Sequence, residues 1–181
     1  MMKNDSRRTV LLGGPEKREI VIVDYDPTWP TKFERHAKKI QDALQGKAVS
    51  IEHVGSTAVP GLAAKPIIDI DLVVEDSSNE SSYLPALEAA GYTLRVREPD
   101  WYEHRMMRTP ELDVHIHIFS PDTPELARHV RFRDQLRNNP NDRMLYANTK
   151  RRLSNRTWND MNDYARAKTE VIEGILSKTA L

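Results

Sequence analysis

The sequence predicts an α/β (α+β) fold, in which a mixed sheet with flanking helices is followed by a C-terminal helical segment. Before residue 120, short segments of alternating apolar and polar residues stand between segments with helical spacing, which is typical of one layered domain. After Pro121 the alternation ends, and apolar residues recur only at helical spacing. We expect these later helices to pack on the sheet, because their apolar faces need a partner.

The individual elements follow from the same periodicities and from turn residues. Strands are expected at residues 20–24, 48–54, 67–74, 92–98, 102–108 and 112–119. Helices are expected at residues 31–44, 82–90, 125–137, 141–153 and 158–177. Gly55 ends the second strand, Gly91 follows the second helix, and Pro140 separates the third helix from the fourth. Short connections between the last three strands favour an antiparallel meander.

Length and charge indicate a single domain. The chain has 181 residues, enough to bury a sizeable core, and we expect a flexible lead-in at 1–19 and one domain at 20–181, with its helical segment from about residue 122. Lys plus Arg number 27 and Asp plus Glu number 27, so the formal net charge is +0. This balance argues against bulk binding to nucleic acid or to a membrane surface.

Two absences from the sequence restrict its chemistry and location. There is no Cys, which excludes disulfides, a thiol nucleophile and a Cys-ligated zinc. The apolar run near the N-terminus, from Val10 to Leu12, is too short for a signal peptide or a membrane span. We therefore expect a cytoplasmic protein.

Two carboxylates interrupt the most apolar predicted strand. Asp69 and Asp71 share one face of the segment 67–74, whereas Ile68, Ile70 and Leu72 share the other. The two acids then lie about 7 Å apart along the strand. Burying charge is costly without a compensating partner, so the pair indicates either a solvated sheet face or a cation site.

The predicted strand 112–119 repeats this pattern. Asp113, His115 and His117 alternate with apolar residues and form a second polar face. If the two strands are neighbours, five ionisable groups converge on one patch, which suits a divalent cation. Carboxylate oxygens favour Mg²⁺ or Mn²⁺, whereas imidazole shifts the preference toward Mn²⁺, Zn²⁺ or Fe²⁺.

A turn between two strands is the candidate phosphate site. Gly55, Ser56 and Thr57 follow a strand, and glycine backbone with nearby hydroxyls binds phosphate well. Such a turn is also a common helix cap, and the spacing of a Walker loop is absent. Lys65, four residues before Asp69, is either a phosphate ligand or a solvated lysine.

The order of these motifs resembles the polymerase-β-like nucleotidyltransferase superfamily. More closely, the runs EHVGSTAVPGLAAKPIIDIDLVV, HIHIF and FRDQLRNNPNDRMLYANTKRRL resemble the GrpB family over roughly residues 20 to 175. The resemblance implies a mixed sheet of the nucleotidyltransferase type, with Gly55 and Ser56 at the triphosphate. It assigns Asp69 and Asp71 to the metal pair and as catalytic residues. Arg131 and Lys150 also match family positions and are candidates for phosphate binding.

The third carboxylate of the superfamily falls on the strand 112–119, where this chain offers Asp113, His115 or His117. Three functions remain open. The first is metal-dependent nucleotidyl transfer with Mg²⁺ or Mn²⁺, the second is a nucleotide- or phosphate-binding module without turnover, and the third is a metal hydrolase that uses the histidines and the Asp pair. In each case the expected partner is a nucleotide or another phosphorylated small molecule.

Overall fold

The computed structural model describes residues 7–179 and contains one six-stranded mixed sheet. The strand order is β1-β4-β5-β6-β3-β2, and only the central pair β3–β6 is parallel. The strands are β1 (Val10–Leu11), β2 (Ala48–Val54), β3 (Ile68–Val74), β4 (Thr93–Glu98), β5 (His104–Arg108) and β6 (Val114–Phe119). The mixed sheet and the β4–β5–β6 meander confirm the fold class that the sequence predicts.

Six α-helices complete the described part of the chain. They are α1 (Trp29–Leu44), α2 (Leu84–Ala89), α3 (Pro124–Asn138), α4 (Pro140–Ser154), α5 (Met161–Ala167) and α6 (Thr169–Leu176). Two short 3₁₀ turns, η1 (Ser56–Ala58) and η2 (Glu80–Ser82), precede β3 and α2. The single helix expected at 158–177 is therefore two helices that meet at Lys168, and the Asp160 side chain caps the first by accepting from the Asn162 amide.

The N-terminal segment differs most from expectation. The predicted strand at 20–24 is reduced to one bridge, in which Val23 exchanges backbone hydrogen bonds with Ala64. By contrast, the expected flexible lead-in contains β1, which adds to the sheet edge beside β4. The Arg95 guanidinium donates to the carbonyls of Leu12 and Gly14, and this fixes the chain after β1. Residues 1–6 of the lead-in lie outside the described range.

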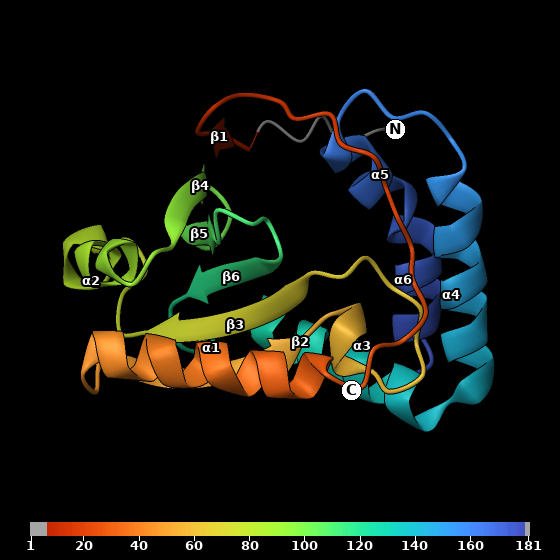
Figure 1. Ribbon diagram of the computed structural model, residues 1–181, viewed down its shortest axis with the longest axis horizontal. Helices are drawn as coiled ribbons and strands as arrows, with labels where there is room; N and C mark the ends of the chain where they lie inside the picture. Colours follow the sequence, from red (N-terminus) through yellow and green to blue (C-terminus); the bar gives the residue numbers. More distant parts are fainter. Residues whose placement is uncertain (1–6, 180–181) are drawn as a thin grey trace.

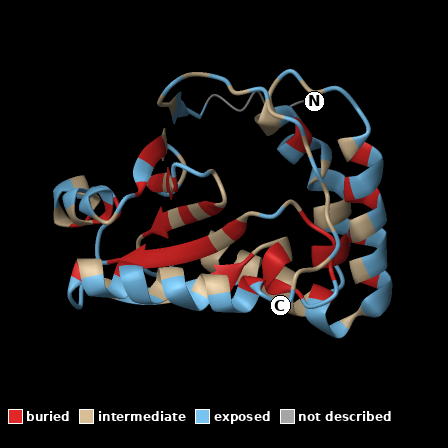
Figure 2. Ribbon diagram, viewed as in Figure 1, coloured by how far each residue is buried: buried red, intermediate tan, exposed pale blue. Residues whose placement is uncertain are grey.

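The main core lies between one face of the sheet and the helices α1 and α2. Ile68, Ile70 and Leu72 of β3 are fully buried there, as the alternation predicts, and Ile40 of α1 and Leu87 of α2 pack against them. Figure 1 shows α1 along the sheet, and Figure 2 shows its buried side facing β3 while its outer side is exposed.

The C-terminal helices have a separate core. Leu136, Tyr146 and Ile175, from α3, α4 and α6, pack around Val59 and Leu62 of the segment that follows η1. The expected partner of these helices was the sheet. The helix α3 does contact β2, but the apolar core that the helices share forms around the loop between β2 and β3 (Figure 1). This arrangement places the helices beside the Gly55 turn. Within residues 7–179, no helix has the length and apolar character needed to cross a membrane.

Candidate metal and phosphate site

The two polar-faced strands are direct neighbours. In the parallel register of β3 and β6, Asp69 lies opposite His115 and Asp71 lies opposite His117. Paired residues of adjacent strands point to the same side of a sheet, so all four side chains lie on the face opposite α1. The alternation in the sequence thus correctly identified the shared patch.

Three of these side chains form a group with the geometry of a cation site. Asp69, His115 and His117 each offer one ligand atom, and the three atoms lie within 4.8 Å of one another. Asp69 Oδ1 is 3.3 Å from His117 Nε2 and 3.8 Å from His115 Nδ1. A set of one carboxylate and two imidazoles suits Mn²⁺, Zn²⁺ or Fe²⁺ better than it suits Mg²⁺.

The electrostatics of the group stabilise charge on Asp69. Burial would raise the pKa of its carboxyl, but the hydrogen bond from His117 and the charges of both histidines lower it to about 2. Burial opposes charge on His117, yet the contact with Asp69 raises the pKa of this imidazole. Burial lowers the pKa of His115 to about 4, only partly offset by Asp69. The Asp69 carboxylate is therefore anionic across the neutral pH range.

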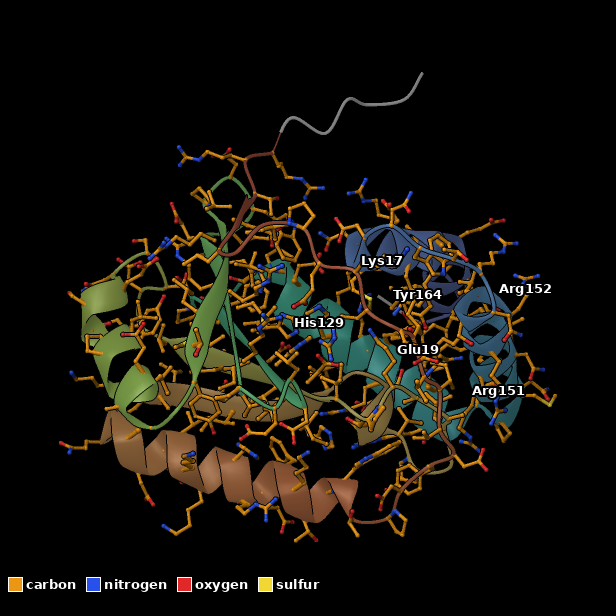
Figure 3. The ribbon with its side chains drawn as sticks, turned by 45° about the horizontal axis from the view of Figure 1, so that its top comes forward. Lys17, Glu19, His129, Arg151, Arg152 and Tyr164 are labelled. Atoms are coloured by element: carbon orange, nitrogen blue, oxygen red, sulfur yellow. The ribbon has the colours of Figure 1, made fainter. Side chains whose placement is uncertain are left out.

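Asp71 occupies the buried end of the patch and has a partner that the sequence did not indicate. Its Oδ2 lies 2.8 Å from Nδ1 of His129, which comes from α3. Its Oδ1 is buried without a hydrogen-bond partner among the described residues. Figure 3 shows His129 between the sheet and the C-terminal helices. A bound cation would satisfy such an orphaned carboxylate oxygen, so the residues present fit a metal.

Asp113, the remaining candidate ligand, lies elsewhere. Its carboxylate accepts from Lys32 Nζ at 2.5 Å and from Thr109 Oγ1 at 2.6 Å. β6 begins only at Val114, and Leu112 has a left-handed backbone with φ of 61°. The strand alternation therefore does not extend back to Asp113, and its side chain turns toward α1.

The turn after β2 requires glycine at position 55. Gly55 has φ of 73° and ψ of −172°, a conformation essentially restricted to glycine. A Cβ atom there would lie 2.7 Å from Asp69 Oδ2. Of the two hydroxyls that follow, Ser56 Oγ accepts from Lys150, whereas Thr57 Oγ1 is buried and donates to the Ile67 carbonyl. Ser56 faces the site, and Thr57 fastens the turn to the chain before β3.

A cavity of about 280 Å³ joins the turn to the cation group. Besides Asp69, His115 and His117, it is lined by Ser56, Tyr164 and the lysines Lys65, Lys150 and Lys168. The sequence indicated Lys65 and Lys150 but not Lys168, which comes from the junction of α5 and α6. Arg131 is not among the lining residues within the described range, and its Nε is buried without a partner there.

Lys150 is buried, Lys65 and Lys168 are half-buried, and none of the three has a carboxylate partner among the described ion pairs. Lys65 and Lys168 lie over the ring of Tyr164, 5.1 and 4.8 Å from its centroid. Burial lowers the pKa of Lys65 to about 8 and that of Lys150 to about 6, and it also lowers the pKa of Lys168. Lysines whose charged forms are disfavoured by burial and by one another favour an anionic ligand with several charges, which restores those charged forms.

Comparison with known proteins identifies the family. Residues 19–178 match the family model described as GrpB protein. The chain belongs to the GrpB family. It is 51% identical over 164 residues to a UPF0157 protein of Halalkalibacterium halodurans, covering 91% of this chain and 84% of that one. It is 27% identical over 171 residues to the glutamate-rich protein GrpB of Alkalihalophilus pseudofirmus, covering 91% and 98%.

One solved structure of a GrpB protein agrees with the family assignment. The structure of the conserved protein GrpB from Enterococcus faecalis superposes with a TM-score of 0.73 at 30% identity, covering 87% of this chain and 98% of that one. The Cid1 poly(U) polymerase matches with a TM-score of 0.46 at 11% identity, covering 72% and 45%. A dephospho-CoA kinase of Mycolicibacterium paratuberculosis shares 29% identity over 173 residues, and the match covers 42% of that longer chain.

Proposed function

We propose that this GrpB-family protein is a metal-dependent nucleotidyltransferase, with a nucleoside triphosphate as one substrate. One observation supports this most: a single cavity holds the Asp69–His115–His117 group together with three lysines. A cation group beside a polycationic pocket suits a metal-bound polyphosphate. In this proposal a hydroxyl or phosphate oxygen of the acceptor attacks the α-phosphorus, and pyrophosphate leaves.

The residues of the chain have separate parts in the proposal. Asp69, His115 and His117 would hold Mn²⁺ or Mg²⁺, which when bound lowers the charge repulsion at the reacting phosphate. The Gly55–Ser56 turn and Lys150 would orient the triphosphate. Lys65 and Lys168 would stabilise the negative charge that gathers on the leaving pyrophosphate.

The direct test is a screen of the four nucleoside triphosphates with Mn²⁺ or Mg²⁺. We expect a metal-dependent rise in melting temperature with at least one nucleotide, and pyrophosphate release once an acceptor is supplied. Metal-dependent binding without release for any of a panel of hydroxyl and phosphate acceptors favours the alternative of a binding module. Absence of nucleotide binding contradicts both.

A second function is favoured by the composition of the cation group. One carboxylate and two imidazoles can also hold a metal ion that activates a water molecule. The site therefore suits a hydrolase that acts on a phosphorylated small molecule. Metal analysis of the purified protein separates the two proposals. Stoichiometric Zn, Fe or Mn retained through purification supports the hydrolase, whereas loosely bound Mg²⁺ or Mn²⁺ supports nucleotidyl transfer.

Binding of a triphosphate without metal should depend on pH through Lys150. Its pKa is about 6 in the free protein, and Lys65, Lys168, Arg151 and Asp69 are the charges that act on it. A bound anion favours the ammonium form and raises this pKa, so binding takes up a proton and affinity increases as pH falls toward about 6. Each linked proton contributes at most about tenfold per pH unit.

Calorimetry with Lys150→Arg provides the control, because arginine stays charged throughout this range. The pH dependence of the variant should be shallower than that of the wild type, since only Lys65, Lys168 and the ligand still titrate. Equal slopes for the two proteins would show that Lys150 is not coupled to the ligand.

A further inference from the structure

A line of three side chains leads away from the cation group along the sheet. His117 Nδ1 lies 3.2 Å from His104 Nε2, and His104 Nδ1 lies 2.7 Å from Glu98 Oε2. The other nitrogen of His117, Nε2, faces Asp69. Glu98 and His104 are cross-strand partners on β4 and β5, and β5 pairs with β6, which carries His117. The line therefore runs across three consecutive strands.

The chemistry of the three groups gives the line one direction. A carboxylate only accepts hydrogen bonds, so His104 Nδ1 carries the hydrogen that Glu98 receives. In a neutral ring the second nitrogen, Nε2, then has no hydrogen and accepts. His117 Nδ1 must donate to it, which leaves Nε2 of a neutral His117 with a free lone pair. In the free protein Nε2 instead carries a second hydrogen, which it donates to Asp69, and a cation bound beside Asp69 would replace that hydrogen and meet the lone pair.

Packing holds the intermediate ring in this orientation. His104 is only 5% exposed. Its ring stacks on Phe119, with centroids 4.7 Å apart and planes at 29°, and the nearly parallel ring of His117 lies beside it, 5.4 Å away at 16°. Trp101 meets it edge-on at 5.1 Å. Rotation of the ring would break these contacts together with both hydrogen bonds.

We propose that Glu98 and His104 are positioning residues that fix the tautomer and orientation of His117, so that its Nε2 is presented to an imidazole-binding cation such as Mn²⁺ or Zn²⁺. The inference rests on the metal site of the proposed function, but not on nucleotidyl transfer. Partners of this kind around a ligating histidine typically change metal affinity 10- to 100-fold.

Glu98→Gln is the sharpest variant, because glutamine has nearly the same shape and can donate a hydrogen bond. If this glutamine donates to His104 Nδ1, both hydrogen bonds of the line reverse direction. His104 Nε2 then donates to His117 Nδ1, so His117 Nε2 carries the hydrogen and cannot bind a cation. We expect the affinity for Mn²⁺, measured by calorimetry on the full chain, to fall by about tenfold or more. Glu103→Gln is the matched control, since Glu103 is a nearby carboxylate that pairs with Arg105, and its affinity should match the wild type.

His104 itself is tested by a loss and a rescue. His104→Phe keeps the ring but removes both nitrogens, so Mn²⁺ affinity should fall about 10- to 100-fold. His104→Gln can accept from His117 and donate to Glu98, so it should recover most of that loss. Melting temperatures of all variants show whether each is folded, and Glu98→Gln keeps the test valid if His104→Phe unfolds.

The tautomer is read directly from ¹⁵N spectra of the chain loaded with diamagnetic Zn²⁺. We expect the hydrogen of His117 on Nδ1 in the wild type and a changed pattern in Glu98→Gln. Unchanged metal affinity in both Glu98→Gln and His104→Phe, or a hydrogen on Nε2 of the wild type, overturns the inference while leaving nucleotidyl transfer intact. Metal binding with the expected variant effects but without pyrophosphate release supports the inference and contradicts nucleotidyl transfer. A wild type that binds no divalent cation contradicts both.

Discussion

Replacing Asp69 with asparagine is expected to lower the affinity for Mn²⁺ by more than about 100-fold and to abolish metal-dependent pyrophosphate release. Asp69 is the only carboxylate in the three-residue cation group, and the other two ligands are uncharged when they bind a metal. Asparagine keeps the size of the side chain but loses the negative charge that holds a divalent ion. Loss of a ligand should exceed the 10- to 100-fold effect of residues that only support a ligand.

The same substitution should have the opposite effect on the nucleotide in the absence of metal. Asp69 acts on Lys65 and Lys150 and favours their charged forms, but its own charge also repels phosphate. Without that repulsion, metal-free binding of a triphosphate, followed by calorimetry, should be retained or strengthened. This divergence separates removal of a metal ligand from general disruption of the cavity.

Asp71 and Asp113 complete the comparison. Asp71→Asn should also lower turnover, because its buried Oδ1, which has no partner among the described residues and which a cation would satisfy, becomes part of an amide. Asp113→Asn should leave Mn²⁺ affinity unchanged, since Asp113 pairs with Lys32 beside α1. Mn²⁺ binding equal to wild type in Asp69→Asn, or an equal loss in Asp113→Asn, would show that the cation site is placed wrongly.

The contrast between Asp69 and Asp113 shows how far the sequence predicted the site. Strict alternation on β3 and β6 was sufficient to place Asp69, His115 and His117 on one face, because a strand fixes the side of every residue within it. It failed at Asp113, where the strand has not yet begun and Leu112 takes a left-handed conformation. Periodicity does not show where a strand starts to within one residue, and that single residue decides the direction of the side chain.

The groups that sequence reasoning missed all reach the site from other elements. His129 comes from α3, Lys168 from the α5–α6 junction and His104 from β5. Each is a single polar residue with no repeating pattern around it. The positions of His129 and Lys168 depend on how the C-terminal helices pack around Val59 and Leu62, and this second core has no signature in local spacing. The sheet was predictable, whereas the enclosure of its polar face was not.

Gly55→Ala should remove the cation site while leaving the rest of the chain folded. The new Cβ would lie 2.7 Å from Asp69 Oδ2 and 3.1 Å from Asp69 Cβ, so the carboxylate must move or the turn must open. Alanine must also adopt a backbone conformation that is nearly exclusive to glycine, which costs about 1–3 kcal/mol of unfolding free energy. We expect urea denaturation to show that loss and calorimetry to show little remaining Mn²⁺ affinity.

Gly14→Ala separates backbone strain from the approach to Asp69. Gly14 has φ of 75°, close to the 73° of Gly55, but a Cβ there has no heavy atom within 4 Å. The control should therefore lose unfolding free energy through its backbone alone and bind Mn²⁺ as the wild type does. If Gly55→Ala also binds Mn²⁺ normally, the turn does not set the position of Asp69. If both variants lose binding, strain in the backbone is sufficient to disturb the site. If Gly55→Ala loses Mn²⁺ binding and Gly14→Ala keeps it, the result supports the proposal that glycine at position 55 allows the turn to lie against the Asp69 carboxylate.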